Sequence, residues 1–345
     1  MSLIPATILT GFLGSGKTTL LKRILTEAHG QKIAVIENEF GEENIDNEIL
    51  VQDSTEQIIQ LNHGCVCCSI REDLRTTLAD LAEKRRKGEL KFDRVVIETT
   101  GLADPGPVAQ TFFMDDEIAE SYLLDSILTL VDAKHAESQL DTRQEARRQI
   151  GFADQIFISK TDLVDDTTVE ALIHRIKHMN PRAKQTRVNF GDVPLADVFD
   201  LRGFNLNAKL DIDPEFLNAD PHAGHDHDDH DHEHGEHCDH PQHHAHDDDV
   251  KSFVFRADKA FNPAKLEEFL GAIVQVYGPK MLRYKGVLNM KGADRKVIFQ
   301  GVHQLMGSDL GPKWMPGEKK SSKMVFIGLD LPRDVFLQGL EGCLV

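Results

Sequence analysis

Residues 11 to 18 read GFLGSGKT and fit the phosphate-loop pattern Gly-x4-Gly-Lys-Thr. An apolar run from Ala6 to Leu9 precedes it, and a helical pattern from Lys17 to Ala28 follows it, as the pattern requires. In such a loop the backbone N–H groups converge on phosphates at a helix N-terminus, Lys17 reaches the β and γ oxygens, and the Thr18 hydroxyl binds Mg²⁺. A plain Gly-rich turn would explain the glycines but not the Lys17-Thr18 pair. The sequence therefore predicts a nucleotide site after the first strand.

Outward from this loop, short β-branched runs alternate with amphipathic stretches as far as about Val188. This order predicts a doubly wound α/β domain with a mostly parallel sheet, whose ligands lie off the carboxyl ends of the strands. Strands are expected at residues 6–9, 33–37, 94–98, 126–131 and 155–159, and helices at residues 17–28, 69–86, 143–150 and 168–179.

Two more strand ends carry residues suited to a nucleotide. An acid at a strand end beside phosphates holds Mg²⁺ or its waters, the role expected of Glu98, and Gly101 offers its N–H to the γ-phosphate. Lys17, Glu98 and Gly101 are therefore the candidate catalytic residues.

The motif Ser-Lys-Thr-Asp, residues 159–162, follows a further apolar strand. The Asp162 carboxylate can accept hydrogen bonds from the ring N–H and the exocyclic amine of guanine, and adenine lacks that amine. The common GTPase form of the motif begins with Asn, so Ser159 departs from it, but GTP is still expected to bind more tightly than ATP. The residues expected to hold the nucleotide are Gly11, Gly14, Ser15, Gly16, Lys17, Thr18, Thr19, Lys160 and Asp162.

Three of the five cysteines, Cys65, Cys67 and Cys68, fall within four positions. This odd, crowded set does not fit a disulfide framework, whereas soft thiolates suit Zn²⁺ or Cu⁺. A capping box of Ser69 and Glu72 places the cluster before a helix N-terminus, whose partial positive charge favours thiolate. Buried structural cysteines and a redox relay are the competing interpretations.

Three thiolates do not fill four coordination positions, so a further ligand is expected. Glu37, at the end of the second strand, is the best-placed candidate, because strand ends converge in this architecture. Glu42 and His63 are the alternatives, and an exposed loop histidine explains His63 equally well.

A low-complexity tract from Asp220 to Asp249 holds 11 of the 17 histidines and 11 acidic residues, with no Lys or Arg. Such a composition cannot bury a core, so it predicts a disordered linker. Clustered imidazoles bind Zn²⁺, Ni²⁺ or Cu²⁺ and favour metal collection over a solvated spacer, because a spacer needs no histidine.

Beyond the tract, strands are expected at residues 252–256, 282–289, 296–302 and 324–329, with a helix at 263–276 and a short one closing the chain. This pattern predicts a small α+β domain. The expected division is a nucleotide-binding domain at residues 1–205, a linker at 206–249 and the second domain at 250–345.

Charge and hydropathy limit the partners and the cellular compartment that the sequence predicts. Residues 250–345 carry 15 basic against 9 acidic side chains, in a chain of net charge −18. Three interpretations fit this uneven charge: the acidic and basic parts dock on each other, the basic part binds an acidic partner, or both are ordinary solvated surfaces.

The apolar start has no basic leader, and no run of 18 apolar residues exists, so neither a signal peptide nor a membrane span is expected. Crowded thiols then point to the cytoplasm. One Trp and three Tyr give little surface for stacking nucleic-acid bases, so none is expected as a partner.

Taken in order, five motifs resemble those of the CobW-type metal-chaperone GTPases: residues 11–18, 37–41, 65–68, 98–101 and 159–162. The resemblance covers nearly the whole chain, including residues 98–108, 282–286 and 299–302. It implies that Glu39 and its neighbours form a switch near Mg²⁺, beside Thr18 and Glu98, and that the three cysteines bind the delivered metal. It further implies slow hydrolysis and a small α+β second domain.

The resulting hypothesis is a GTP-hydrolysing metallochaperone that binds zinc, or alternatively Co²⁺ or Ni²⁺, and delivers it to a client metalloprotein under nucleotide control. A metal buffer with a regulatory GTPase and a small-molecule phosphotransferase are the alternatives. The oligomeric state stays open between a monomer and a homodimer.

Overall fold

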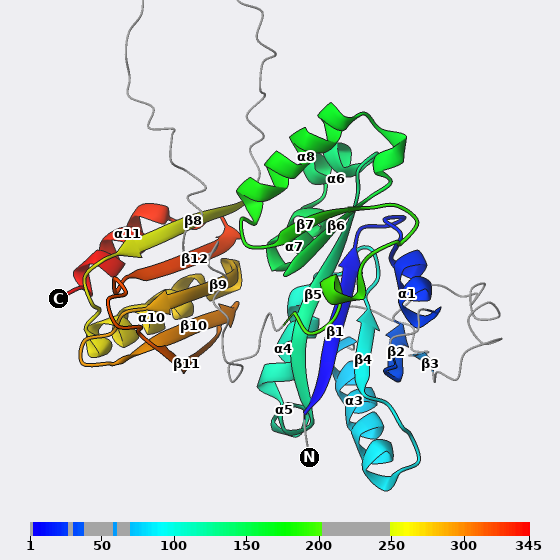
Figure 1. Cartoon of the computed structure of the whole chain (residues 1–345), viewed down its shortest axis with the longest axis horizontal. Helices are drawn as coiled ribbons and strands as arrows, with labels where there is room; N and C mark the ends of the chain where they lie inside the picture. The colour runs from blue at the N-terminus through cyan, green and yellow to red at the C-terminus, as the bar shows by residue number, and fades with distance from the viewer. Residues whose placement is uncertain (1–2, 27–29, 38–57, 61–69, 202–248) are drawn as a thin grey trace, which may run out of the picture.

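The computed structural model describes residues 3–26, 30–37, 58–60, 70–201 and 249–345, which form two lobes (Figure 1). The first lobe holds a seven-stranded sheet of order β3-β2-β4-β1-β5-β6-β7, and each neighbouring pair is parallel. Its strands are β1 (Ile4–Gly11), β2 (Ile33–Glu37), β3 (Ile58–Gln60), β4 (Arg94–Glu98), β5 (Tyr122–Asp132), β6 (Gln155–Ser159) and β7 (Lys184–Val188).

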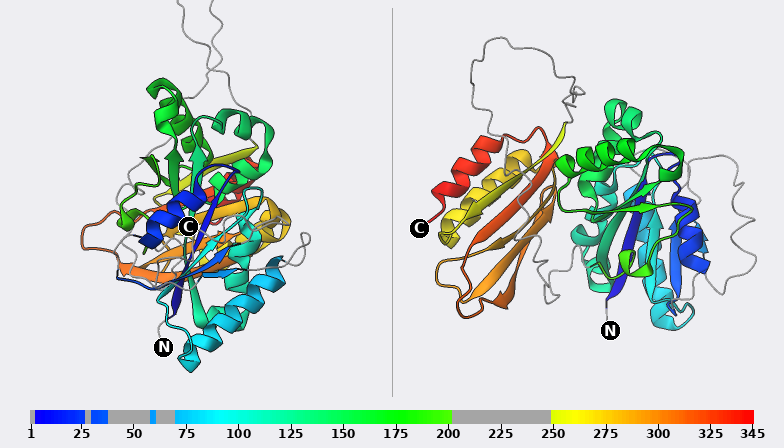
Figure 2. Two further views of the ribbon diagram at one scale, coloured as in Figure 1. Left: turned by 90° about the vertical axis from the view of Figure 1, so that its right-hand side faces the viewer. Right: turned by 45° about the horizontal axis from the view of Figure 1, so that its top comes forward.

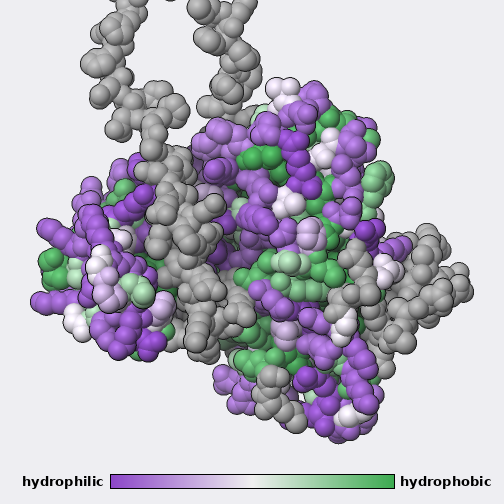
Figure 3. Space-filling model, viewed as in Figure 1, coloured by the Kyte–Doolittle hydropathy of each residue, from purple (hydrophilic) through white to green (hydrophobic). Residues whose placement is uncertain are grey.

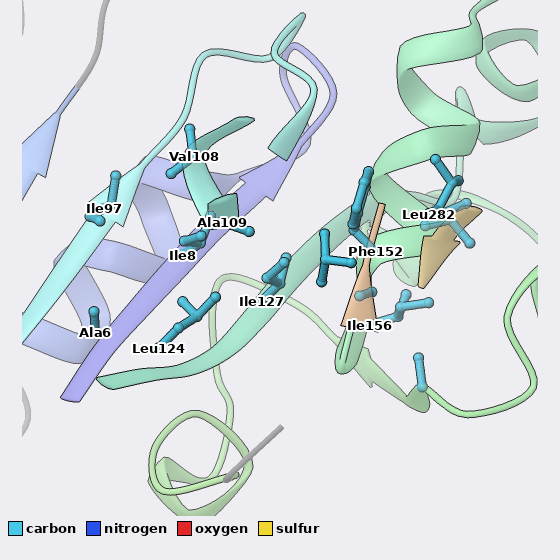
Figure 4. Packing of buried hydrophobic residues seen from close by; sticks show 14 of the residues in the cluster. Ala6, Ile8, Ile97, Val108, Ala109, Leu124, Ile127, Phe152, Ile156 and Leu282 are labelled. Atoms are coloured by element: carbon cyan, nitrogen blue, oxygen red, sulfur yellow. The ribbon is translucent and has the colours of Figure 1, made fainter. Parts of the chain in front are cut away.

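Helices cover both faces of this sheet. They are α1 (Lys17–Thr26), α3 (Ile70–Lys87), α4 (Pro105–Met114), α5 (Asp116–Ser121), α6 (Ala136–Thr142), α7 (Gln144–Phe152) and α8 (Asp166–Met179), with 3₁₀ turns η1 (Thr161–Leu163) and η2 (Leu195–Asp197). Successive side chains of β1 point to opposite faces: Ile8 packs in a core with α3, α4, α7 and α8, whereas Leu9 packs in a core with α1. Figure 4 shows the first of these cores. The doubly wound fold is confirmed.

The two edge strands of this sheet, β3 and β7, were not predicted from the sequence. In β7 only Val188 is fully buried, so the strand has no apolar run, and β3 spans three residues. Helix α4 was missed because it begins Pro-Gly-Pro, which looks like a turn. Asp104 caps it by accepting a hydrogen bond from the Gly106 N–H at 2.9 Å, and proline is well suited to a first helical position.

The second lobe is a five-stranded antiparallel sheet of order β11-β10-β9-β12-β8. Its elements are β8 (Val250–Ala257), α10 (Pro263–Tyr277), η3 (Gly278–Lys280), β9 (Met281–Leu288), β10 (Arg295–Val302), β11 (Leu305–Lys313), β12 (Ser322–Leu329) and α11 (Arg333–Gly342). Helices α10 and α11 cover the face turned away from the first lobe (Figure 2). The ring centroids of Phe253 and Phe326 lie 5.3 Å apart, and Phe336 meets both edge-on. The expected α+β domain is confirmed, with β11 as an additional edge strand.

The opposite face of this sheet packs on the first lobe, so the two parts of the chain dock. Leu282 of β9 belongs to the same apolar core as Ile150 and Phe152 of α7 (Figure 4). A Cβ on Gly151 would lie 2.6 Å from the Leu282 Cδ1 atom, so a larger residue at this position would force the Leu282 side chain to move. Arg283, 2% exposed, donates to the Phe152 carbonyl at 3.0 Å and holds both Asp154 oxygens. Among the described residues, the contact thus combines apolar packing with the buried ion pair of Arg283 and Asp154.

Polar side chains cover most of the described surface in the view of Figure 3. Among the described residues, no helix is both long enough and apolar enough to cross a membrane.

Candidate nucleotide site

The phosphate loop lies between β1 and α1 with the backbone that its glycines allow. Gly11, Gly14 and Gly16 have φ values of 141°, 72° and 101°, which residues other than glycine rarely adopt. Lys17 is buried, and its ammonium donates to the carbonyls of Gly11 at 2.9 Å and Phe12 at 3.3 Å. The charge therefore sits over the loop that is expected to hold phosphates.

Thr18 and Glu98 come together from positions 80 residues apart. The Thr18 hydroxyl donates to the Glu98 Oε1 atom at 3.2 Å, because β4 ends beside the start of α1. A hydroxyl and a carboxylate beside a phosphate loop are the hard oxygen donors that Mg²⁺ prefers. The residues present fit the metal, while Thr19 in the same turn is exposed.

The loop after Glu98 is held on two sides. On one side Gly101 packs on the phosphate loop, where a Cβ would lie 2.6 Å from the Leu13 backbone nitrogen. On the other, the buried Gln149 amide of α7 donates to the carbonyls of Gly101 at 3.1 Å and Ala103 at 3.0 Å. The loop after Glu98 thus connects the phosphate loop to α7.

The guanine motif is attached to the same phosphate loop. The buried Ser159 hydroxyl donates to the Ser15 carbonyl at 2.7 Å, so the departure from Asn keeps a link between the two motifs. Lys160 has a left-handed φ of 57°, and its ammonium donates to Asp132 at 2.7 Å. Burial alone would raise the pKa of Asp132, but hydrogen bonds from Lys160 and His135 outweigh it and hold the pKa below its ordinary value. Asp162 itself is exposed at the start of η1, with its carboxylate accessible to a ligand.

Two side chains that contact this site, Gln149 and Asn189, were not predicted from the sequence. Gln149 lies on a predicted helix, and the signal was a polar residue at a position that the helical periodicity assigns to the core. Asn189 follows the unpredicted β7, and its Oδ1 atom accepts from the Thr161 N–H at 3.0 Å and the Thr161 hydroxyl at 3.1 Å.

Of the candidate ligands for the transferred metal, only Glu37 lies within the described residues. Cys65, Cys67, Cys68, Glu42, His63 and the proposed magnesium ligand Glu39 all lie outside them. Glu37 is the register partner of Glu98 on one side and of Gln60 on the other. The carboxylate assigned to the transferred metal is thus next to the carboxylate assigned to Mg²⁺.

The described residues offer no group of three or more His, Cys, Asp or Glu side chains placed to hold a metal ion. Cys343, the one free cysteine among them, is buried near the end of α11, and burial raises the pKa of its thiol. It is a core residue of the second lobe.

Two family models divide the chain as its lobes do. The model described as CobW/HypB/UreG, nucleotide-binding domain matches residues 5–187, and the cobalamin synthesis protein cobW C-terminal domain matches residues 250–344. The chain belongs to the CobW family. It is a P-loop GTPase.

Two curated CobW-family relatives match along almost their whole length. The zinc chaperone YjiA of Escherichia coli K12 is 39% identical over 344 residues, 99% of each chain. The zinc chaperone CobW of Pseudomonas aeruginosa PAO1 is 33% identical over 99% of this chain and 92% of its own. Among solved structures, the Zn(II)-bound YjiA GTPase from E. coli superposes with a TM-score of 0.75 and 36% identity, covering 99% of both chains.

Proposed function

We propose that this CobW-family GTPase holds zinc at Cys65, Cys67 and Cys68 with help from Glu37, and releases it to a client metalloprotein under the control of GTP and Mg²⁺. Glu39 and Glu42 fall in the segment between Glu37 and β3 and are the remaining candidate ligands, Glu39 for Mg²⁺ and Glu42 for the transferred metal. Zinc is preferred over Co²⁺ and Ni²⁺ because thiolates are soft donors and because the two full-length relatives are named zinc chaperones.

The observation that carries the proposal is the pairing of Glu37 with Glu98 in adjacent strands. Glu98 meets Thr18 of the phosphate loop, and the loop after it is bound to α7. A change in the bound phosphates would therefore act on Glu98, which lies next to Glu37 in the adjacent strand. Metal and nucleotide are then coupled, and linkage requires each to change the affinity of the other by the same factor, typically about 5- to 150-fold.

Competition with a zinc chelator measures this coupling. Zinc affinity is compared with GDP bound and with a non-hydrolysable GTP analogue bound, and we expect tighter zinc binding with the analogue. The triple change of the three cysteines to Ser should remove tight zinc binding while GTP still binds, and Glu37→Gln should weaken zinc binding and reduce the nucleotide effect. Equal zinc affinities in both states would overturn gated delivery and favour a metal buffer.

A further inference from the structure

Phe190 is the most exposed large apolar side chain in the described part of the chain, with 82% of its surface accessible. Its φ is 56°, and the φ of Gly191 is 73°. The Asn189 carbonyl accepts from the Asp192 N–H at 3.0 Å, which closes a four-residue turn around these two positive φ angles. Asn, Asp and Gly are the usual residues at such positions, and a bulky side chain there is strained. Folding alone favours neither the strain nor the exposure of this ring.

The turn is fixed to the guanine motif on one side. Val188, the last residue of β7, pairs with Ser159 at the end of β6. Asn189 then accepts both hydrogen bonds from Thr161, the residue before Asp162. The ring of Phe190 is thus carried by a backbone that is tied directly to the residues assigned to the base.

The turn is fixed to the phosphate-loop helix on the other side. A Cβ on Gly191 would lie 3.2 Å from both the Leu20 Cα atom and the Thr19 carbonyl oxygen of α1. The Arg23 guanidinium of the same helix meets Asp192 at 3.0 Å. Phe190 therefore projects from the junction between the element that holds phosphates and the motif that holds the base.

We propose that the Phe190 ring packs on a face of the guanine base bound at Asp162. Asp162 can read only the hydrogen-bonding edge of the base, and its flat faces need an apolar partner to leave water. An aromatic ring supplies that partner and is indifferent to the groups on the edge, because every base has a π face. The proposal rests on the guanine site assigned to Asp162, and it gives the strained, exposed ring a ligand.

Substitution by alanine tests the proposal through nucleotide affinity. Phe190→Ala should weaken GTP and GDP equally, by about 5- to 150-fold, which is the usual range for removing an aromatic ring from a base. ATP should weaken by the same factor, so the preference for GTP over ATP stays as in the wild type. Asp162→Ala should instead change that preference. Phe113→Ala, which removes another exposed phenyl ring at the far end of α4, is the matched control and should leave affinity unchanged.

A glycine variant separates ligand binding from folding. Glycine adopts positive φ freely, so Phe190→Gly should keep or raise the melting temperature of the nucleotide-free protein while GTP affinity falls. A tryptophan variant reports the contact directly: in a Trp314→Phe background, Phe190→Trp leaves one tryptophan, and its fluorescence should change when GDP binds.

The outcomes distinguish the two levels of the argument. Wild-type affinity in Phe190→Ala, with a clear preference for GTP in the wild type, overturns the stacking proposal alone. Wild-type nucleotide affinity combined with altered self-association or altered binding of a partner protein assigns the ring to a protein interface and likewise overturns it. A wild type that does not prefer GTP overturns the guanine site itself.

Discussion

Asp162, the residue proposed to bind the guanine base, lies in a turn whose backbone is held by neighbouring residues. Lys160 is anchored by Asp132, Thr161 is anchored by Asn189, and the Leu163 N–H donates to the Lys160 carbonyl at 3.1 Å. The short turn is thereby fixed before a ligand arrives, so little ordering entropy is lost on binding. The exposed Asp162 carboxylate stays accessible to the proposed base.

Replacement of Asp162 should remove the preference for guanine. Wild-type protein is expected to bind GTP about tenfold or more tightly than ATP, because each hydrogen bond to a charged group is worth about 1.5–3 kcal/mol and 1.4 kcal/mol is a factor of ten. Asp162→Ala should bring the two affinities together by weakening GTP. Isothermal titration of both nucleotides checks this, with Asp165→Ala as a nearby control. Equal affinities in the wild type would contradict the assignment.

Lys285 lies at the contact between the lobes and should make stability depend on pH. Burial, together with Arg182 and Arg283, lowers the pKa of Lys285 to about 7. The unfolded chain therefore binds more protons than the folded one between pH 7 and the ordinary lysine pKa. Stability should rise with pH across that window, with a slope of at most about 1.4 kcal/mol per pH unit.

Lys285→Met should raise the melting temperature at pH 7 and flatten the rise, since the variant has no ammonium to desolvate. Its advantage over the wild type should shrink as the pH approaches 10. Lys259→Met, at an exposed lysine of the same lobe, should change neither quantity. Melting curves across this pH range decide the matter, and parallel curves for wild type and Lys285→Met would contradict it.

Among the elements, α7 contacts both the loop after Glu98 and the second lobe. Gln149 binds the loop after Glu98, and Arg148 donates to Asp104 at 2.7 Å where that loop ends. Its last turn packs on the second lobe through Gly151 and Phe152, whose ring lies 5.1 Å from that of His303. The C-terminal half of α7 therefore contacts both the loop after Glu98 and the second lobe, so a shift of that loop should be felt at the contact between the lobes.

Gln149→Met tests this role because it keeps the volume of the side chain and removes both donated hydrogen bonds. Each buried carbonyl left without its donor costs about 1–3 kcal/mol, so the loop should loosen. GTP hydrolysis should fall, and the ratio of zinc affinities between the two nucleotide states should move toward one. Gln338→Met, at an exposed position on α11, is the control. A wild-type affinity ratio in Gln149→Met would assign the coupling to another element.

An element could be predicted from the sequence when its own residues carry a distinctive pattern. The phosphate loop, the strand ending in Glu98 and the strand before Ser159 are central, so their buried runs and fixed spacings identify them. The edge strand β7 is polar at every position except Val188, and the hydrogen bonds of Asn189 and Gln149 join residues 28 and more positions apart. Such pairings arise from the packing of whole elements, so a local pattern can mark a residue such as Gln149 but cannot identify its partner.

For the whole molecule, the His/Asp tract is expected to act separately from the GTPase. Asp249 at its end is already part of the fold, since it accepts from Gln144 at 3.0 Å and also from Arg147. Deleting residues 221–247 spares this contact. The deletion should lower the total zinc bound per chain while GTP hydrolysis and the tight zinc site keep wild-type values. Metal analysis after dialysis, alongside steady-state hydrolysis, measures both. Loss of the tight site would show that the tract is one of its components.

The core shared by α7 and β9 bears on how the molecule unfolds and how it can be cut. Because Ile150, Phe152 and Leu282 lie in one continuous apolar cluster, neither lobe can open without exposing the interior of the other. Calorimetry should therefore give one transition, with equal calorimetric and van't Hoff enthalpies. A fragment ending at residue 201 would present the side of α7 around Gly151 to water as an apolar patch and should self-associate. The two family models divide the sequence between the lobes, but the two lobes together should form one cooperative folding unit.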